Sequence, residues 1–232
     1  MNRNKEIFVK QHMGLGDNIV HNGMVRKLSK VYPNCKIIVP THHHNKKNVS
    51  RMFVDNKNIV IEGYHTHHEM ENIVNGKKYY KVLSSCLLTN SKYRYGEYFD
   101  DAFYLEVGMS PEIKKEFFYI ERDYDKEKQV YKEMVTDKSI TEYIFLHEKP
   151  KENILIDRSK IPNLPIIYAD PKYDFFDLLG VIENASQCHL ISSSFVSLMT
   201  CKNFNPKTYV HMYADRVELI NHIKKTGLEI II

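Results

Sequence analysis

Short apolar runs alternate with longer amphipathic stretches along the first half of the chain. The run Ile7-Phe8-Val9 is flanked by polar residues and predicts a strand over residues 6–12. Apolar positions at helical spacing follow over residues 18–32, and Pro33-Asn34 ends that helix. The same alternation continues, with predicted strands over 35–40, 58–62 and 79–83 and predicted helices over 48–54, 69–75 and 96–108. This order of strands and helices is typical of a parallel sheet that helices cover on both faces.

A charged stretch, residues 121–128, separates this half from a second half with a similar pattern. The stretch continues into a helical segment over residues 129–135, so a solvated helix also fits its charges. The second half contains predicted strands over 143–147, 153–157, 165–169, 188–191, 207–213 and 228–232, and predicted helices over 174–185, 194–201 and 215–225. We therefore expect an α/β protein of two small Rossmann-like lobes facing a cleft, residues 1–120 and 121–232.

Composition and charge narrow the class of protein. The chain has 232 residues, of which 43% are hydrophobic and 12% aromatic, so a packed core is feasible. The formal net charge of +4 suits a small anionic ligand and is too weak to indicate a nucleic acid partner. Cysteines without a Cys-x-x-Cys pair indicate reduced thiols, and no apolar run is long enough for a membrane span. Since a strand follows the first residues directly, without a signal peptide, we expect a cytoplasmic protein of open oligomeric state.

The loop after the first predicted strand carries the most informative motif, Met13-Gly14-Leu15-Gly16-Asp17. A strand, a glycine-rich turn and a helix start form a common cradle for charged ligands, because the helix N-terminus offers free N–H groups and a partial positive charge. Gly14 and Gly16 are the residues expected to shape this loop. Asp17 is unusual in a phosphate cradle, and it fits either a general base or a helix N-cap.

The second motif lies in the second half, where the predicted strand over 188–191 runs into Ser192-Ser193-Ser194-Phe195 and a helix. This arrangement places hydroxyls and free N–H groups at the carboxyl edge of a sheet, where open α/β sheets bind ligands. Phosphate is the ligand that such a helix start suits best. An N-cap serine with small neighbours explains the same residues equally well.

Taken together, the two motifs resemble the GT-B glycosyltransferases, in particular the heptosyltransferase-like group with its fucosyltransferase-like relatives. That group has a Gly-Asp loop after the first strand, and a helix, a strand and a small or acidic cluster before a helix in the second lobe. The resemblance spans most of the chain and is carried by residues 15–17, 99–104, 108–111, 143–148, 178–185 and 188–195.

The resemblance implies metal-independent transfer of a sugar from a nucleotide-sugar donor to a hydroxyl of a glycan acceptor. Asp17 matches the aspartate that is proposed to deprotonate the acceptor, and the serine segment matches the region that holds the donor diphosphate. The implied donor-binding residues are His147, Lys149, Ser192, Ser193, Ser194 and Phe195. The sequence departs from the heptosyltransferase pattern, since Ser-Ser-Phe replaces the usual Asp-Thr-Gly and Leu198 replaces a histidine. These departures argue against a heptose donor, and a non-catalytic nucleotide- or sugar-binding protein of the same fold is the alternative.

Residues expected to contact the acceptor, and residues considered for metal binding, complete the candidates. Tyr64, Arg94 and Tyr95 are the acceptor candidates. Histidines are frequent, at His42-His43-His44 and at residues 65, 67 and 68, but no metal-ligand spacing stands out, so we expect a polar loop near the acceptor sugar. We expect no metal and no cofactor. No Walker loop, no Gly-x-Ser-x-Gly and no complete Gly-x-Gly-x-x-Gly is present, which disfavours an NTPase, an α/β-hydrolase and an NAD-dependent enzyme.

Overall fold

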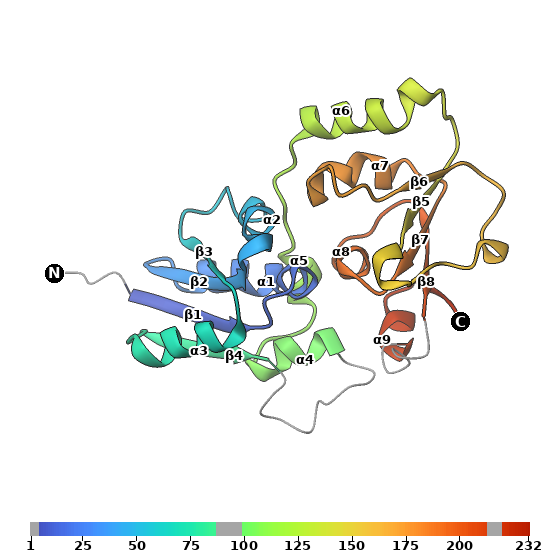
Figure 1. The fold of residues 1–232 in the computed structure, drawn as a ribbon. Coiled ribbons are helices and arrows are strands. Elements are labelled where there is room, and N and C mark those ends of the chain that lie inside the picture. Colours follow the sequence, from blue (N-terminus) through green and yellow to red (C-terminus); the bar gives the residue numbers. More distant parts are fainter. Residues whose placement is uncertain (1–4, 87–98, 213–219) are drawn as a thin grey trace. The chain divides into compact units, whose positions relative to one another are not determined.

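The structure, a computed structural model, describes residues 5–86, 99–212 and 220–232. The chain divides into two compact units, Met1–Glu121 and Arg122–Ile232, and each is built on its own parallel sheet (Figure 1). Both sheets alternate with helices along the chain, so the predicted α/β class is confirmed. The division falls one residue beyond the expected boundary. Within the described ranges, no helix combines the length and apolar character that a bilayer crossing needs.

The N-terminal unit has a four-stranded sheet in the order β3-β2-β1-β4, in which every pairing is parallel. Its strands are β1 (Lys5–Gln11), β2 (Cys35–His42), β3 (Ile59–Tyr64) and β4 (Lys81–Ser85). Because all four run in the same direction, the loops after β1, β2 and β3 meet at one edge of the sheet. The apolar residues of β1 and β2 are fully buried, as expected for a sheet covered on both faces.

Helices of the N-terminal unit pack closely against this sheet and against one another. They are α1 (Leu15–Val31), η1 (His43–Asn45), α2 (Lys46–Arg51), α3 (His67–Gly76), α4 (Phe99–Glu106) and α5 (Ile113–Glu116). A β-carbon added to Gly23 of α1 would lie 2.4 Å from the Ile113 carbonyl oxygen. Gly23 therefore permits the close approach of α1 and α5, a packing role that requires the missing side chain.

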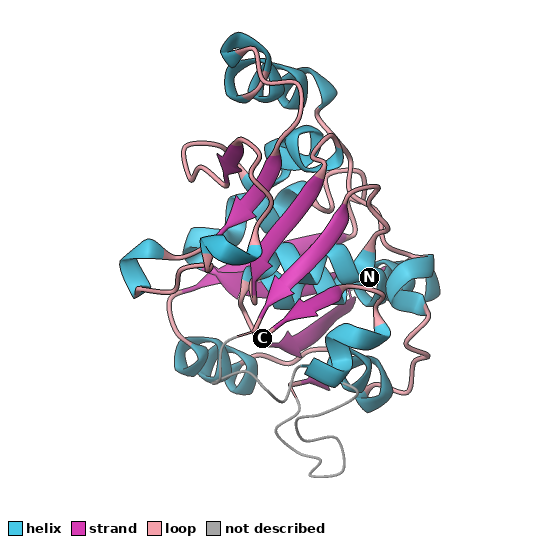
Figure 2. Cartoon of the chain, turned by 90° about the vertical axis from the view of Figure 1, so that its right-hand side faces the viewer, coloured by secondary structure: helices cyan, strands magenta, loops and turns pink. Residues whose placement is uncertain are grey.

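The C-terminal unit has a five-stranded parallel sheet in the order β6-β5-β7-β8-β9. Figure 2 turns this unit toward the viewer, with strands in magenta and helices in cyan. Its strands are β5 (Ile144–His147), β6 (Ile166–Tyr168), β7 (Gln187–Ile191), β8 (Lys207–His211) and β9 (Glu229–Ile231), and its α-helices are α6 (Tyr124–Met134), α7 (Leu179–Glu183), α8 (Ser194–Cys201) and α9 (Ile220–Lys225). Short 3₁₀ turns are η3 (Thr136–Lys138), η4 (Pro150–Glu152), η5 (Arg158–Lys160) and η6 (Phe175–Leu178). Helices α6 and α7 lie side by side over the sheet (Figure 1).

The differences between the predicted elements and the structure include three in the C-terminal unit. The predicted strand over 153–157 is wrong, because Ile154 forms only an isolated bridge with Lys149, and Asp157 caps the turn η5. The predicted helix over 174–185 begins as the 3₁₀ turn η6 and ends at Glu183. Helix α6 begins at Tyr124, so residues 124–128 of the charged stretch are helical, and Glu127 among them is buried.

Candidate functional site

The first candidate site lies at the start of α1, where the helix begins earlier than its hydrophobic pattern indicated. Gly14 is the N-cap and Asp17 is the third helical residue, so the N-cap interpretation of Asp17 is wrong. Gly16 lies in the same first turn. The Asp17 carboxylate accepts hydrogen bonds from its own N–H and from the Gly14 N–H. The carboxylate of the third helical residue therefore reaches back to the cap, as in half of a capping box.

A glycine is required at position 14 because the Asp17 carboxylate needs the space, not because the backbone has an unusual angle. Its φ of −65° and ψ of 155° are open to any residue. A β-carbon at this position, however, would lie 2.5 Å from Oδ2 of Asp17, closer than real contacts allow. Gly14 thus leaves room for the carboxylate to fold back over the loop.

The environment of Asp17 favours the protonated acid. Burial raises the pKa of the Asp17 carboxyl, and the negative charge of Asp100 on α4 raises it further, whereas His12 and the two N–H groups oppose the shift. Among the described residues, no lysine or arginine forms an ion pair with Asp17. A carboxyl with a raised pKa is a better proton acceptor than an ordinary surface aspartate, which is the property that a general base needs.

A buried polar network, which the sequence analysis missed, holds the loop in place. Gln11 Nε2 donates to Asn18 Oδ1 at 2.8 Å, and Asn18 Nδ2 donates to the Gly14 carbonyl at 2.9 Å. The Thr41 hydroxyl donates to the Met13 carbonyl at 3.3 Å. Strands β1 and β2 are therefore both tied to the loop that carries Asp17.

His21 anchors the same turn from the next turn of α1. Its Nδ1 lies 2.7 Å from the Asp17 carbonyl oxygen, which can only accept, so Nδ1 carries a proton. Burial lowers the pKa of His21 to about 4, so the ring is neutral at pH 7. Its Nε2 lies 2.9 Å from Oγ of Ser85, whose hydroxyl donates to the Phe103 carbonyl at 2.8 Å. His21 therefore fixes the backbone of Asp17 without adding charge to the site.

The remaining N-terminal candidates lie in different surroundings. Tyr64 is buried in a small core with Phe8 and Met70, and its hydroxyl donates to Glu62 at 2.5 Å. Burial raises the pKa of Tyr64 above its usual value, so the hydroxyl stays protonated. Arg94 and Tyr95 lie outside the described residues.

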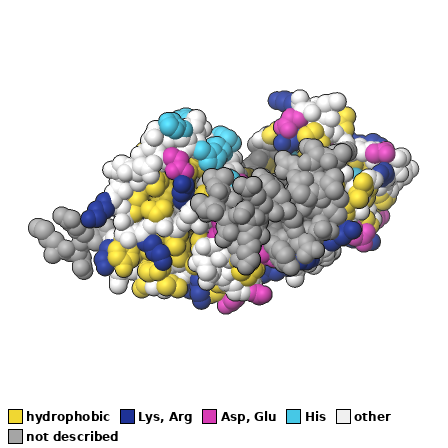
Figure 3. All heavy atoms as spheres, turned by 90° about the horizontal axis from the view of Figure 1, so that it is seen from below, with side chains coloured by type: hydrophobic (Ala, Val, Ile, Leu, Met, Phe, Trp, Pro, Cys, Tyr) yellow, Lys and Arg dark blue, Asp and Glu magenta, His cyan; other side chains and the backbone are white. Residues whose placement is uncertain are grey.

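Several histidines lie where β1, β2 and β3 end, at the edge of the sheet that carries Asp17. Figure 3 shows histidine side chains exposed on this unit. His42 ends β2, and its ring stacks on that of His44 with centroids 5.5 Å apart. His67 at the start of α3 contacts both His42, at 5.6 Å, and His12 after β1, at 6.1 Å. No group of three metal-binding side chains with suitable geometry occurs among the described residues.

The second candidate site lies at the carboxyl edge of the C-terminal sheet, where β7 leads into α8. Ser193 is the N-cap of α8, yet its side chain makes no capping hydrogen bond, and its Oγ is buried with no partner among the described residues. His147 ends the neighbouring strand β5, and its Nδ1 is likewise buried without a described partner. The first N–H bonded within the helix is that of Ser197, and the preceding N–H groups at the mouth of α8 donate to no described group.

Packing and charge around His147 keep its ring neutral. The Phe195 ring lies 4.8 Å from the His147 ring and 4.4 Å from that of Phe175, so Phe195 supports the site from the core side. Burial, followed by the nearby positive charge of Lys149, lowers the pKa of His147 to about 4. Lys149 itself is half-exposed and pairs with Glu152 at 3.0 Å. Ser192 and Ser194 are partly buried beside the helix mouth.

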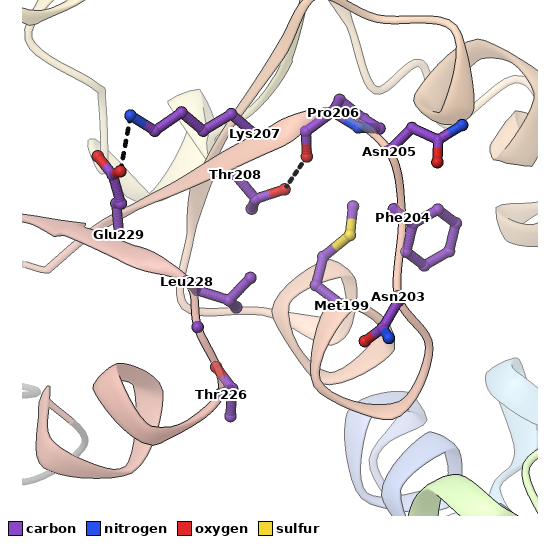
Figure 4. Close-up of a pocket in the computed structure, with 11 residues that line it drawn as sticks. Met199, Asn203, Phe204, Asn205, Pro206, Lys207, Thr208, Thr226, Leu228 and Glu229 are labelled. Atoms are coloured by element: carbon purple, nitrogen blue, oxygen red, sulfur yellow. Dashed lines mark hydrogen bonds and ion pairs between the residues drawn. The ribbon is translucent and has the colours of Figure 1, made fainter.

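A cavity of about 440 Å³ in the C-terminal unit lies away from these groups. It is lined by the first residues of β8 and β9, Lys207 and Glu229, and by residues beyond α8 and α9 such as Phe204 and Leu228 (Figure 4). The parallel sheet places this cavity at the amino edge, opposite the edge that carries His147 and the serines. Two of its lining residues, Lys207 and Glu229, form an ion pair at 2.6 Å.

Comparison with known proteins identifies the fold. No protein-family model and no curated protein matches the sequence. A family 9 glycosyl transferase from Veillonella parvula has a similar structure, with a TM-score of 0.57, 12% identity, and coverage of 91% of this chain and 81% of that one. The Escherichia coli ADP-heptose LPS heptosyltransferase II has a TM-score of 0.55, 7% identity, and coverage of 98% and 90%. The chain has a GT-B, heptosyltransferase-like fold, which confirms the predicted resemblance.

Proposed function

We propose that this chain is a glycosyltransferase that moves a sugar from a nucleotide-sugar donor to a hydroxyl of a carbohydrate or glycoconjugate. The observation that carries the proposal is a pair of buried atoms at the edge of the C-terminal sheet, Ser193 Oγ and His147 Nδ1, which have no hydrogen-bond partner in the part of the chain that the structure describes. Buried polar groups nearly always have a hydrogen-bond partner, so two such atoms beside one helix mouth favour a bound ligand. A diphosphate suits them, because the helix start adds N–H donors and a partial positive charge.

In the proposed reaction, Asp17 accepts the proton of the attacking acceptor hydroxyl. The new C–O bond forms at the anomeric carbon while the bond to the nucleoside diphosphate breaks. Fixed donors of the C-terminal unit hold the charge that develops on the leaving group: the α8 N–H groups, Ser193 and a proton on His147 Nδ1. The proposal assigns this work to protein groups rather than to a metal ion. Assistance by a general base contributes about 10²–10⁴ in rate.

Lys149, Ser192 and Ser194 complete the proposed donor site. Lys149 has to exchange Glu152 for the donor, and an exposed pair of this kind is worth only about 0–1 kcal/mol, so the exchange costs little. The two similar structures named above are glycosyltransferases, which supports the reaction class. The departure of the serine segment from the heptosyltransferase pattern favours a donor sugar other than heptose.

A binding assay followed by a turnover assay tests the proposal. Nucleoside diphosphates and their sugar conjugates are added to the protein in a thermal-shift series, because a ligand of the folded state raises the melting temperature. We expect a shift with at least one nucleotide, reduced in Ser193→Ala and retained in Ser197→Ala, one helical turn further along. Absence of any shift contradicts the donor site. Binding without release of nucleoside diphosphate, for any acceptor, identifies the non-catalytic binding protein instead.

A further inference from the structure

The edge of the N-terminal sheet at which its strands begin lies opposite the edge that carries Asp17, and it is rich in lysine. The lysines there are exposed, and none of them forms an ion pair with another described residue. They are Lys5, Lys36, Lys57, Lys78 and Lys81. We call this surface the lysine edge. Figure 3 shows lysine and arginine side chains, in dark blue, among hydrophobic ones, in yellow, on the N-terminal unit.

The register of the sheet places the five lysines close together. Lys81 of β4 lies level with Ile7 of β1, which lies level with Ile37 of β2. Ile59 of β3 continues this row. The other four lysines lie within three residues of the row, on their own strands or in the segments that lead into them. Strands about 4.8 Å apart, with a rise of about 3.3 Å per residue, therefore bring the five backbones into an area of about 15 Å by 10 Å.

Carboxylates beside the lysine edge do not neutralise it. Two of them lie within two residues of these lysines in the sequence, and each already has a cationic partner. Glu6 pairs with Lys77 at 2.7 Å, and Asp55 pairs with Arg26 at 2.7 Å. Strands have only small dipoles, so the sheet itself supplies no negative charge for the lysines at the start of its strands. Five positive charges therefore remain without a counter-ion among the described residues.

Exposed apolar side chains lie among these lysines. Tyr80 is 56% exposed and Val82 is 43% exposed, on either side of Lys81 in the sequence. The Lys5 ammonium lies 4.5 Å from the centre of the Tyr80 ring, and the Lys81 ammonium lies 5.9 Å from that of Tyr32. Lysine stems cover apolar surface while their ammonium groups reach water or an anion. The lysine edge thus presents positive charge and apolar groups together.

We propose that the lysine edge docks on the surface of a lipid bilayer that contains anionic lipids. Clusters of about four to eight basic residues bind such surfaces, and tyrosine rings favour the headgroup level. A nucleic acid would use the positive charge but would leave the exposed Tyr80 and Val82 without a role. Docking leaves the Asp17 loop free, because β1 separates the two edges by about 20 Å. This inference does not rest on the proposed function.

Flotation of the whole protein with lipid vesicles tests the docking. Vesicles of phosphatidylcholine alone are compared with vesicles that also contain phosphatidylglycerol, which is anionic. Binding is measured at about 0.1 M and about 1 M salt, between which the Debye length falls from about 10 Å to about 3 Å. We expect the protein to float with the anionic vesicles at the lower salt concentration, and binding to weaken strongly at the higher one. Neutral vesicles should bind little protein at either concentration.

Variants with matched charge locate the binding surface. The triple variant Lys5→Gln/Lys36→Gln/Lys81→Gln should bind anionic vesicles about 100-fold more weakly, because each lysine near such a surface contributes about fivefold. The control removes the same charge from exposed lysines of the C-terminal unit and should retain binding: Lys128→Gln/Lys138→Gln/Lys151→Gln.

A second variant tests the apolar part of the surface. Tyr80→Ser/Val82→Ser should weaken vesicle binding without changing the charge, whereas binding to a partner held by charge alone would not respond. Thermal unfolding, measured for every variant, should stay close to that of the unaltered protein, because the substituted side chains are exposed.

Several outcomes would overturn the docking surface. These are no binding to anionic vesicles, equal binding to neutral ones, undiminished binding in the triple variant of the lysine edge, or an equal loss in the control. Duplex DNA is offered at the same salt concentrations, and DNA binding that the triple variant loses, without vesicle binding, assigns the edge to nucleic acid and overturns the proposal as well. These assays use neither nucleotide nor acceptor, so their failure leaves the proposed function untouched, and failure of nucleotide binding leaves the docking surface standing.

Discussion

Replacing Gly14 by alanine tests whether the position of the Asp17 carboxylate matters for catalysis. The added β-carbon would lie 2.5 Å from Oδ2, and real β-carbons essentially never come within 3.0 Å of another atom. The backbone of Gly14 suits alanine, so the chain need not rearrange. The carboxylate is therefore the group that moves, and it leaves the Gly14 N–H.

The size of the effect follows from this contact. The oxygen must shift by at least 0.5 Å to reach even 3.0 Å. A misplacement of about 1 Å can cost about 10²-fold in rate, so we expect kcat to fall by about 10- to 100-fold. The free energy of unfolding should fall by only about 1 kcal/mol, because alanine is a poorer N-cap than glycine. Activity should thus fall far more than stability.

The assay is release of nucleoside diphosphate at saturating donor and acceptor, with thermal unfolding measured in parallel. Gly76→Ala is the matched control, because a β-carbon on Gly76 meets nothing within 4 Å. Asp17→Asn sets the scale, with an expected loss of about 10²–10⁴ in kcat. Full activity in Gly14→Ala, beside an inactive Asp17→Asn, would refute the positioning argument. Full activity in Asp17→Asn would refute the general base itself.

Further predictions concern the donor site, the packing of α1 and the response to acid. Ser193→Ala should weaken binding of a nucleoside diphosphate by about 10- to 150-fold in titration calorimetry, because a hydrogen bond to a charged group is worth about 1.5–3 kcal/mol. Gly23→Ala should lower the free energy of unfolding, measured in urea, by about 1–3 kcal/mol, because the new β-carbon meets the backbone of α5. An unchanged free energy of unfolding would contradict the close approach of α1 and α5. Burial lowers the pKa of four histidines to about 4: His21, His147, His189 and His211. The free energy of unfolding should therefore fall as the pH drops from about 6.5 to about 4, because in this range the unfolded chain binds protons at these histidines and the folded chain does not. A constant free energy of unfolding over this range would contradict their burial.

Local patterns were sufficient for most of the secondary structure. The helix predicted over 194–201 coincides with α8, because its apolar spacing, and the serines before it, are local signals. The strand predicted over 153–157 is wrong although Ile154 and Ile156 alternate with polar residues, as in a strand. In the structure Ile154 and Ile156 lie in a loop and pack with Leu146 and Ile191 in a small hydrophobic cluster. Burial of that kind depends on residues far away in the sequence.

The candidate sites were predictable in place but not in detail. The sequence places the glycine loop and the serine segment directly after predicted strands. Because each sheet is parallel, each segment lies at the carboxyl edge of its own sheet. That Ser193 caps its helix without using its hydroxyl depends on side-chain geometry, which no spacing reveals. The influence of His12 and Asp100 on Asp17 comes from tertiary packing, and so does the need for Gly14 to lack a side chain.

The surroundings of Asp17 are themselves an argument that its carboxylate serves function rather than stability. Burial raises its pKa above the value in the unfolded chain, so holding it ionised at pH 7 destabilises the fold. A residue needed only to satisfy the helix start could be exposed, or could be an asparagine, without that cost. Asp17→Asn should therefore raise the melting temperature at pH 7.5 while it lowers activity, and the gain should vanish as the pH falls below about 4, where the unfolded carboxyl is protonated as well. A purely structural aspartate would show the opposite sign, because its replacement would lower the melting temperature at neutral pH.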